Sequence, residues 1–168
     1  MASDVEIHMD DLDLFGCTIW IDADACPSDI KEIVFRSSKR LNIKVVLVAN
    51  QSVRTPDSKL ISAITVRDGA DIADNMIVEK MASGDIVVTG DIPLAARIVE
   101  KGGVAIGTRG ESFDEGTIQS RLATRNLMEQ FRAAGMETSG PKPMSQKDVQ
   151  TFANQLDRLL TKIGRDKP

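Results

Sequence analysis

The feature that most constrains the fold is an alternation, from residue 18 onward, between short apolar runs and helical patterns. The apolar runs are rich in β-branched residues and lack polar alternation, which is typical of parallel strands that are covered on both faces. They lie at residues 18–22, 44–48, 62–67, 85–89 and 104–106. This pattern predicts an α/β domain built around one mostly parallel sheet.

Helical periodicity occupies the segments between and after these strands. Helices are expected at residues 28–41, 71–82, 93–101, 117–134 and 145–163. Ser145 and Asp148 form a capping box that starts the last helix, and Gly135 is expected to end the helix before it. We therefore predict a three-layer α/β/α fold with a mostly parallel sheet of about five strands and two additional C-terminal helices.

The first 16 residues differ in charge from the rest of the chain. They hold five acidic residues and no Lys or Arg, whereas the remainder holds 21 basic and 20 acidic residues. A short acidic segment of this kind is typical of a solvated extension. We expect residues 1–16 to form a flexible tail and residues 17–168 to form a single domain of ordinary size.

Composition excludes several classes of protein. No apolar run approaches the ~20 residues that a membrane span needs, and the N-terminus lacks the features of a signal peptide. Two cysteines, Cys17 and Cys26, are too few for a disulfide framework and indicate a reducing compartment. The only histidine, His8, lies in the acidic segment, which argues against a histidine-based triad. We expect a cytoplasmic protein without a membrane partner; the sequence does not define its oligomeric state.

Polar and ionisable residues follow every predicted strand, and several of them are aspartates. Parallel strands bring their carboxyl ends to one edge of the sheet, where open α/β folds bind ligands. Converging carboxylates repel one another unless a counter-charge is present, and Mg²⁺ prefers a few carboxylates plus water. The candidate ligands for Mg²⁺ or Mn²⁺ are Asp22, Asp24, Asp71, Asp74 and Asp91.

Most of these aspartates also have a structural explanation. Asp71 suits a helix N-cap, Asp74 suits the first helical turn, and Asp91 can help to start the helix that follows it. Asp24 can support the turn before Cys26. Asp74, however, heads an apolar stripe and therefore points toward the core. Their joint placement at one edge favours a metal site.

The same edge carries groups that suit a phosphate-containing substrate. Arg54 and Arg109 can bind a phosphate through two hydrogen bonds, although an exposed loop arginine is an equally good explanation for each. Arg121 and Arg125 lie four residues apart on a predicted helix and give it either a basic face or an ordinary exposed one. The candidate substrate-binding residues are Asn50, Gln51, Arg54, Thr89 and Arg109.

Four segments resemble the bacterial YaiI/YqxD family, whose function is uncharacterised. They are IWIDADACP at 19–27, VANQS at 48–52, DIADN at 71–75 and VTGDIPLA at 88–95. The resemblance runs from about residue 18 to residue 162, with Gly90, Thr55 and residues 107–108 departing from the usual pattern. It implies a fold similar to PIN-domain nucleases, which hold Mg²⁺ or Mn²⁺ with acids at strand ends and cut RNA. By position, the resemblance assigns the acid after the first strand to Asp22 and the acid after the Val-Thr strand to Asp91. The acid in the middle of the chain corresponds to Asp74 or Asp71.

The leading hypothesis is therefore a divalent-metal-dependent nuclease-like domain that acts on RNA. Asp22, Asp74 and Asp91 are its expected catalytic metal ligands, and Asp24 and Asp71 are further or supporting ones. The metal would activate a water molecule for attack on a phosphodiester.

Two alternatives remain open. The first is a PIN-like module that binds RNA or protein without cutting, because a fold does not fix a function. The second is an aspartyl-phosphate phosphatase in which Asp22 is the nucleophile and Asp24 the acid. For such phosphatases a later Gly-Asp-x-x-x-Asp motif is expected; Gly90-Asp91 begins it, but Ala95 stands where its last Asp should be.

Overall fold

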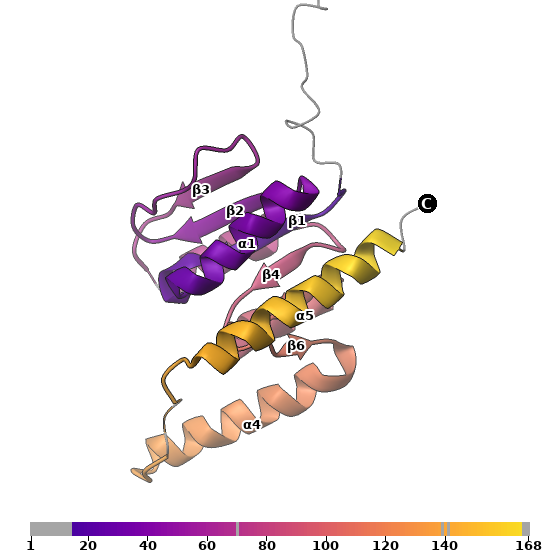
Figure 1. Cartoon of the computed structure of the whole chain (residues 1–168). Helices are drawn as coiled ribbons and strands as arrows, with labels where there is room; N and C mark the ends of the chain where they lie inside the picture. The colour runs from indigo at the N-terminus through magenta and orange to yellow at the C-terminus, as the bar shows by residue number, and fades with distance from the viewer. Residues whose placement is uncertain (1–14, 70, 139, 141, 166–168) are drawn as a thin grey trace, which may run out of the picture.

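A six-stranded sheet forms the middle layer of the molecule (Figure 1). The computed structural model describes residues 15–69, 71–138, 140 and 142–165, so the expected tail at residues 1–16 lies almost wholly outside the described residues. The strands are β1 (Thr18–Asp22), β2 (Lys44–Ala49), β3 (Ile61–Thr65), β4 (Ile86–Val88), β5 (Val104–Ile106) and β6 (Ser112–Phe113). Their order across the sheet is β3-β2-β1-β4-β5-β6, and every pairing is parallel except that of β5 with β6.

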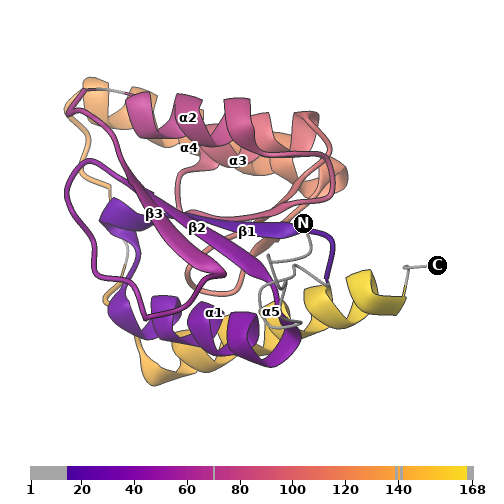
Figure 2. The same cartoon turned by 90° about the horizontal axis from the view of Figure 1, so that it is seen from above.

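Helices cover both faces of this sheet, as predicted. Figure 2 shows α1 and α5 on one side and α2, α3 and α4 on the other. The helices are α1 (Ser28–Leu41), α2 (Ile72–Lys80), α3 (Ile92–Glu100), α4 (Glu115–Ala133) and α5 (Gln146–Arg165), and a 3-10 helix, η3 (Ala23–Ala25), follows β1. The three-layer α/β/α architecture is confirmed.

The two helical layers bury two separate apolar clusters. Because successive strand residues point to opposite faces, Ile19 and Ile21 of β1 pack beneath α1 and α5, where Phe152 is also fully buried. Trp20 points the other way and packs with residues of α2 and α3 such as Ile77. A strand that is buried on both faces has no polar alternation, which explains the apolar runs in the sequence.

The ends of the elements differ from the predicted ends by at most two residues, apart from two elements that were not predicted. The strand β6 and the helix η3 are only two and three residues long, and such short segments carry no periodic pattern. Helix α4 begins two residues earlier than expected because Asp114 caps it by accepting hydrogen bonds from the N–H groups of Gly116 and Thr117.

Helix α5 begins as the sequence predicts. The Ser145 N–H donates to Asp148 Oδ2 over 3.1 Å, and the Asp148 N–H donates to Ser145 Oγ over 3.2 Å. These reciprocal bonds form the predicted capping box. Gly135, at φ = 80°, follows the end of α4 in the left-handed conformation that glycine adopts freely.

The strand order reverses beside β1. From β1 the chain moves outward through β2 to β3 and then crosses back to β4, which pairs with the other side of β1. In open α/β sheets the crevice at such a reversal, at the carboxyl ends of the strands, is where ligands bind. Asp22 ends β1 and Thr89 directly follows β4, so both lie at this crevice.

Candidate functional site

Asp22 occupies the carboxyl end of β1 and is half-buried. The parallel register pairs Ile21 with Val88, which places Asp22 beside Thr89, and Thr89 Oγ1 donates a hydrogen bond to Asp22 Oδ2 over 2.9 Å. Burial raises the pKa of Asp22; the bond from Thr89 opposes this rise, and the charges of Asp91 and Asp24 add to it. Asp22 is thus a carboxylate whose ionised form is poorly stabilised.

Thr89 links Asp22 to Asp91. The Thr89 side chain is buried, and its Oγ1 also accepts a hydrogen bond from the Asp91 N–H over 3.0 Å. Asp91 caps α3, since its Oδ1 accepts a hydrogen bond from the Leu94 N–H over 3.1 Å. The structural interpretation of Asp91 as a helix start is therefore confirmed. Its second carboxylate oxygen has no hydrogen-bond partner among the described residues.

Asp74 lies in the first turn of α2, where the sequence places it, and is half-buried. Burial raises its pKa to about 6, and the charges of Asp91, Asp22 and Asp71 add to the rise, while Arg97 opposes it. Asp71 precedes α2 with φ = 67°, and its side chain makes no capping hydrogen bond. Asp71 therefore occupies the N-cap position without the capping bond expected there.

Asp24 joins the ends of two strands. It is exposed on η3, and its Oδ2 accepts a hydrogen bond from the Asn50 N–H over 2.8 Å, which ties the end of β1 to the end of β2. Within the described part of the chain, Asn50 Oδ1 is the one buried side-chain polar atom that lacks a hydrogen-bond partner. A buried oxygen without a donor is costly and suits a site that receives a cation or a hydrogen-bond donor.

The charges of the other predicted aspartates act on Asp22 and Asp74, so the structure brings the five residues to the carboxyl ends of the strands. Asp22 is affected by the charges of Asp91 and Asp24, and Asp74 by those of Asp91, Asp22 and Asp71. Nevertheless, the described residues include no group of three or more His, Cys, Asp or Glu side chains arranged to hold a metal ion. The oxygen donors suit Mg²⁺, which commonly binds one or two carboxylates and keeps several waters.

A cavity of about 380 Å³ opens between the ends of β1 and β4. Asp22 and Asp91 line it together with Arg125, which comes from α4. The described residues that line it are Asp22, Ala25, Gly90, Asp91, Ile92, Pro93, Thr108 and Arg125. The sequence predicted Arg125 only as part of a basic face or an ordinary exposed face of a helix, because helical periodicity alone does not show which part of the fold that face meets.

None of the five predicted substrate-binding residues, Asn50, Gln51, Arg54, Thr89 and Arg109, belongs to this lining. Arg109 donates hydrogen bonds to Asp148 Oδ2, over 2.8 Å, and to the carbonyl of Lys142, so it anchors the segment that leads into α5. Gln51 and Arg54 are exposed between β2 and β3. Their role in phosphate binding stays a prediction, and Arg109 already uses both Nη1 and Nη2 in hydrogen bonds within the protein.

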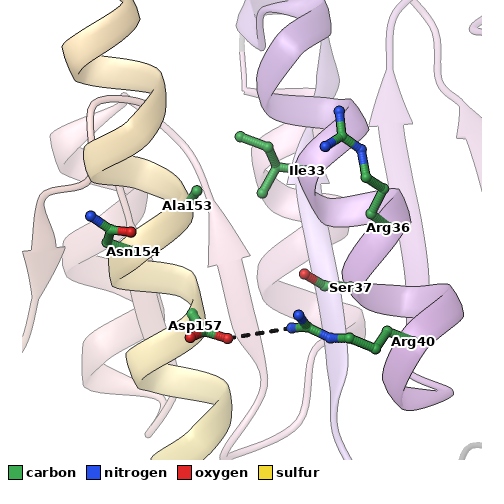
Figure 3. A pocket seen from close by; sticks show the side chains of 7 residues that line it. All are labelled: Ile33, Arg36, Ser37, Arg40, Ala153, Asn154 and Asp157. Carbon is green, nitrogen blue, oxygen red and sulfur yellow. Dashed lines mark hydrogen bonds and ion pairs between the residues drawn. The ribbon is translucent and has the colours of Figure 1, made fainter.

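A second cavity, of about 460 Å³, lies between α1 and α5 (Figure 3). The one carboxylate in its lining, Asp157, already accepts a hydrogen bond from Arg40 over 3.3 Å. The described residues of this lining include no second acidic group, so it lacks the cluster of carboxylates that is gathered at the strand ends. The crevice beside β1 is therefore the better candidate site.

The fold and the site together define a doubly wound α/β protein with an acidic crevice at its strand reversal. The chain belongs to the YaiI/YqxD family, since residues 20–162 match the family described as "Uncharacterized BCR, YaiI/YqxD family". It is 52% identical over 147 residues to a UPF0178 protein of Herminiimonas arsenicoxydans, which covers 88% of this chain and 99% of that relative. It is 54% identical over 145 residues to a UPF0178 protein of Dechloromonas aromatica, which covers 86% of this chain and 97% of the relative. The resemblance found in the sequence is confirmed at the level of the family.

No helix in the described part of the chain is both long and apolar enough to cross a membrane.

Proposed function

We propose that this protein is a divalent-metal-dependent phosphodiesterase with a PIN-like site that acts on RNA. The observation that carries the proposal is the group of mutually repelling aspartates at the strand reversal, two of which line a cavity. Such a group suits a cation, and a cavity beside it suits the substrate.

Asp22 and Asp91 are the residues best placed to hold Mg²⁺ or Mn²⁺, because both line the cavity. Asp74 would complete the set, with Asp24 and Asp71 as further or supporting ligands. When bound, the metal would supply a water molecule of lowered pKa and neutralise charge on the phosphodiester. Thr89 would orient Asp22 through its hydroxyl, in the way that hydrogen-bond partners commonly orient metal ligands. Water is the expected nucleophile, and its activation would depend on the metal, because the only histidine, His8, lies in the acidic N-terminal segment and is not expected to act as a general base.

The proposal is tested by cleavage of end-labelled single-stranded RNA in Mn²⁺, in Mg²⁺ and in EDTA. The wild type should cut only with metal, and Asp22→Asn should lower the rate by more than about 100-fold, the upper limit for loss of a mere supporting residue in metal sites. Asp157→Asn is the matched control, because Asp157 is exposed and pairs with Arg40 in the other cavity. Metal-dependent cutting that survives Asp22→Asn would refute the assignment.

A non-catalytic PIN-like module that binds RNA or protein is the second candidate. The absence of a ready-made group of three metal ligands among the described side chains favours it. RNA binding without metal uptake would establish it in place of the nuclease.

The phosphatase alternative has less support. Its acid, Asp24, is bound to the Asn50 N–H and does not belong to the cavity lining that contains Asp22. We further propose that residues 17–168 act as one domain in the cytoplasm, because two cysteines, Cys17 and Cys26, are too few for a disulfide framework.

A further inference from the structure

Helix α4 carries three arginines, and they differ in how their charges are matched. Arg121 pairs with Glu111 and lies 5.7 Å from the ring centre of Phe113. Arg132 pairs with Glu129 over 2.5 Å. Arg125 has no carboxylate partner within the described residues, and its one hydrogen bond is a 3.4 Å contact with the amide of Asn126.

The packing of α4 directs Arg125 toward the body of the protein. Ile118 is the buried residue of this helix and belongs to the apolar cluster with α3, and Leu122 is half-buried. Arg125 lies three residues after Leu122 and seven after Ile118, and this spacing places all three on the same helical face. Arg125 therefore lies on the same side of the helix as Ile118, where its exposed side chain lines the cavity beside β1.

Within that cavity Arg125 shares a space with two carboxylates but does not neutralise them. Asp22 and Asp91 line the same cavity, yet neither forms an ion pair with Arg125. A cavity that holds unpaired groups of both signs suits a ligand with a metal-bound anionic group. Guanidinium binds phosphate oxygens through two parallel hydrogen bonds, whereas the carboxylates require a cation between them and the phosphate.

The other described residues of the lining are not suited to recognise a nucleotide base. These other described residues have small, apolar or hydroxyl side chains and include no aromatic ring on which a base could stack. A nucleic-acid ligand is therefore expected to contact this cavity through its sugar-phosphate backbone.

We propose that Arg125 binds a phosphate oxygen of single-stranded RNA in the cavity beside β1, so that this site recognises the RNA backbone independently of sequence. The inference rests on the proposed function for its choice of RNA as the ligand. It assigns the phosphate contact to α4 and not to Arg109, whose guanidinium already binds Asp148 and the carbonyl of Lys142.

The test compares Arg125→Ala with Arg132→Ala, which removes the same charge from the same helix but outside the cavity. Binding of fluorescent oligo(U) and oligo(A) single strands is measured by anisotropy in Ca²⁺ over a range of salt concentrations, with intact RNA verified on gels. Arg125→Ala should weaken both complexes about tenfold and lower the salt slope by about 0.7, the value for one phosphate contact on a single strand. Arg132→Ala should change affinity less than about twofold.

Each result of this experiment either supports or overturns the proposed phosphate contact of Arg125. Equal affinity of Arg125→Ala and the wild type, equal losses in both variants, or a loss confined to one RNA sequence would overturn the inference. Failure of the wild type to bind RNA would overturn both the inference and the proposed function. Binding that depends on Arg125 without any metal-dependent cleavage would uphold the inference and refute the phosphodiesterase. Because Arg125 is exposed and has no carboxylate partner among the described residues, its removal should leave the unfolding temperature unchanged.

Discussion

Two aspartates at opposite ends of the neighbouring strands β1 and β4 differ in how many hydrogen bonds compensate their loss of water. Asp85, just before β4, is 7% exposed and accepts hydrogen bonds from the Thr18 N–H, the Trp20 Nε1–H and the Ala82 N–H, at 2.9–3.0 Å. Asp22, at the carboxyl end of β1, accepts one hydrogen bond, from Thr89, and the charges of Asp91 and Asp24 raise its pKa.

The difference separates a structural carboxylate from one that is available to a ligand. Three donors replace the water that Asp85 loses on burial, so its charge ties β1, β4 and the preceding turn together. Asp22 lacks such compensation, and its neighbours raise the free energy of its ionised form. A protein keeps such a cost where binding or catalysis uses it.

The largest expected effect is the difference in the free energy of unfolding between a variant at Asp85 and a variant at Asp22. Asp85→Ala leaves three donors without an acceptor, including the buried Trp20 indole N–H, and should lower the free energy of unfolding by about 3 kcal/mol or more. Asp22→Asn in EDTA should change it by less than about 1 kcal/mol, because the amide oxygen can still accept the bond from Thr89. Urea unfolding of both variants measures the difference, and equal losses would remove the contrast.

Asp74 should make the free energy of unfolding depend on pH. Its pKa is about 6 in the folded protein against 3.8 for an unperturbed aspartate, so between these pH values the folded state binds the extra proton. Protonation of Asp74 therefore stabilises the metal-free protein at pH 4, and this contribution is lost as the pH rises past about 6. Asp74→Asn should abolish that dependence and, since Asp74 is only half-buried, raise the free energy of unfolding at pH 7 by no more than about 1 kcal/mol.

Urea unfolding of wild type and Asp74→Asn in EDTA from pH 4 to pH 8 checks this. Identical pH profiles for the two proteins would show that the charges around Asp74 do not repel as the structure indicates.

The sequence predicted the acidic edge because it depends only on topology. Runs of β-branched residues identify buried parallel strands, and parallel strands end together, so the gathering of Asp22, Asp74 and Asp91 followed from the alternation of strands and helices. Strand β6 was not predicted because two residues carry no pattern, and its pairing with β5 is set by the fold around it.

Side-chain partners that are distant in sequence could not be predicted in this way. Arg109 and Asp148 are 39 residues apart, and their ion pair depends on how α5 returns to the sheet. Arg125 lines the cavity because of where α4 lies against α3, although its spacing from Ile118 and Leu122 was a usable signal. The orientation of carboxylate groups around a cation is likewise a matter of rotamers, which hydrophobic periodicity does not encode.

Binding of a divalent cation by the strand-end aspartates is tested most directly by thermal unfolding. Wild type, Asp22→Asn and the control Asp157→Asn are unfolded in EDTA and then in Mn²⁺ or Mg²⁺. A metal at 100 times its Kd adds about 2.7 kcal/mol, or roughly 5–10 °C for a domain of this size. We expect that shift for the wild type and Asp157→Asn and its absence in Asp22→Asn. An unresponsive wild type at millimolar metal, or an equal shift in Asp22→Asn, would contradict a metal site at the strand ends.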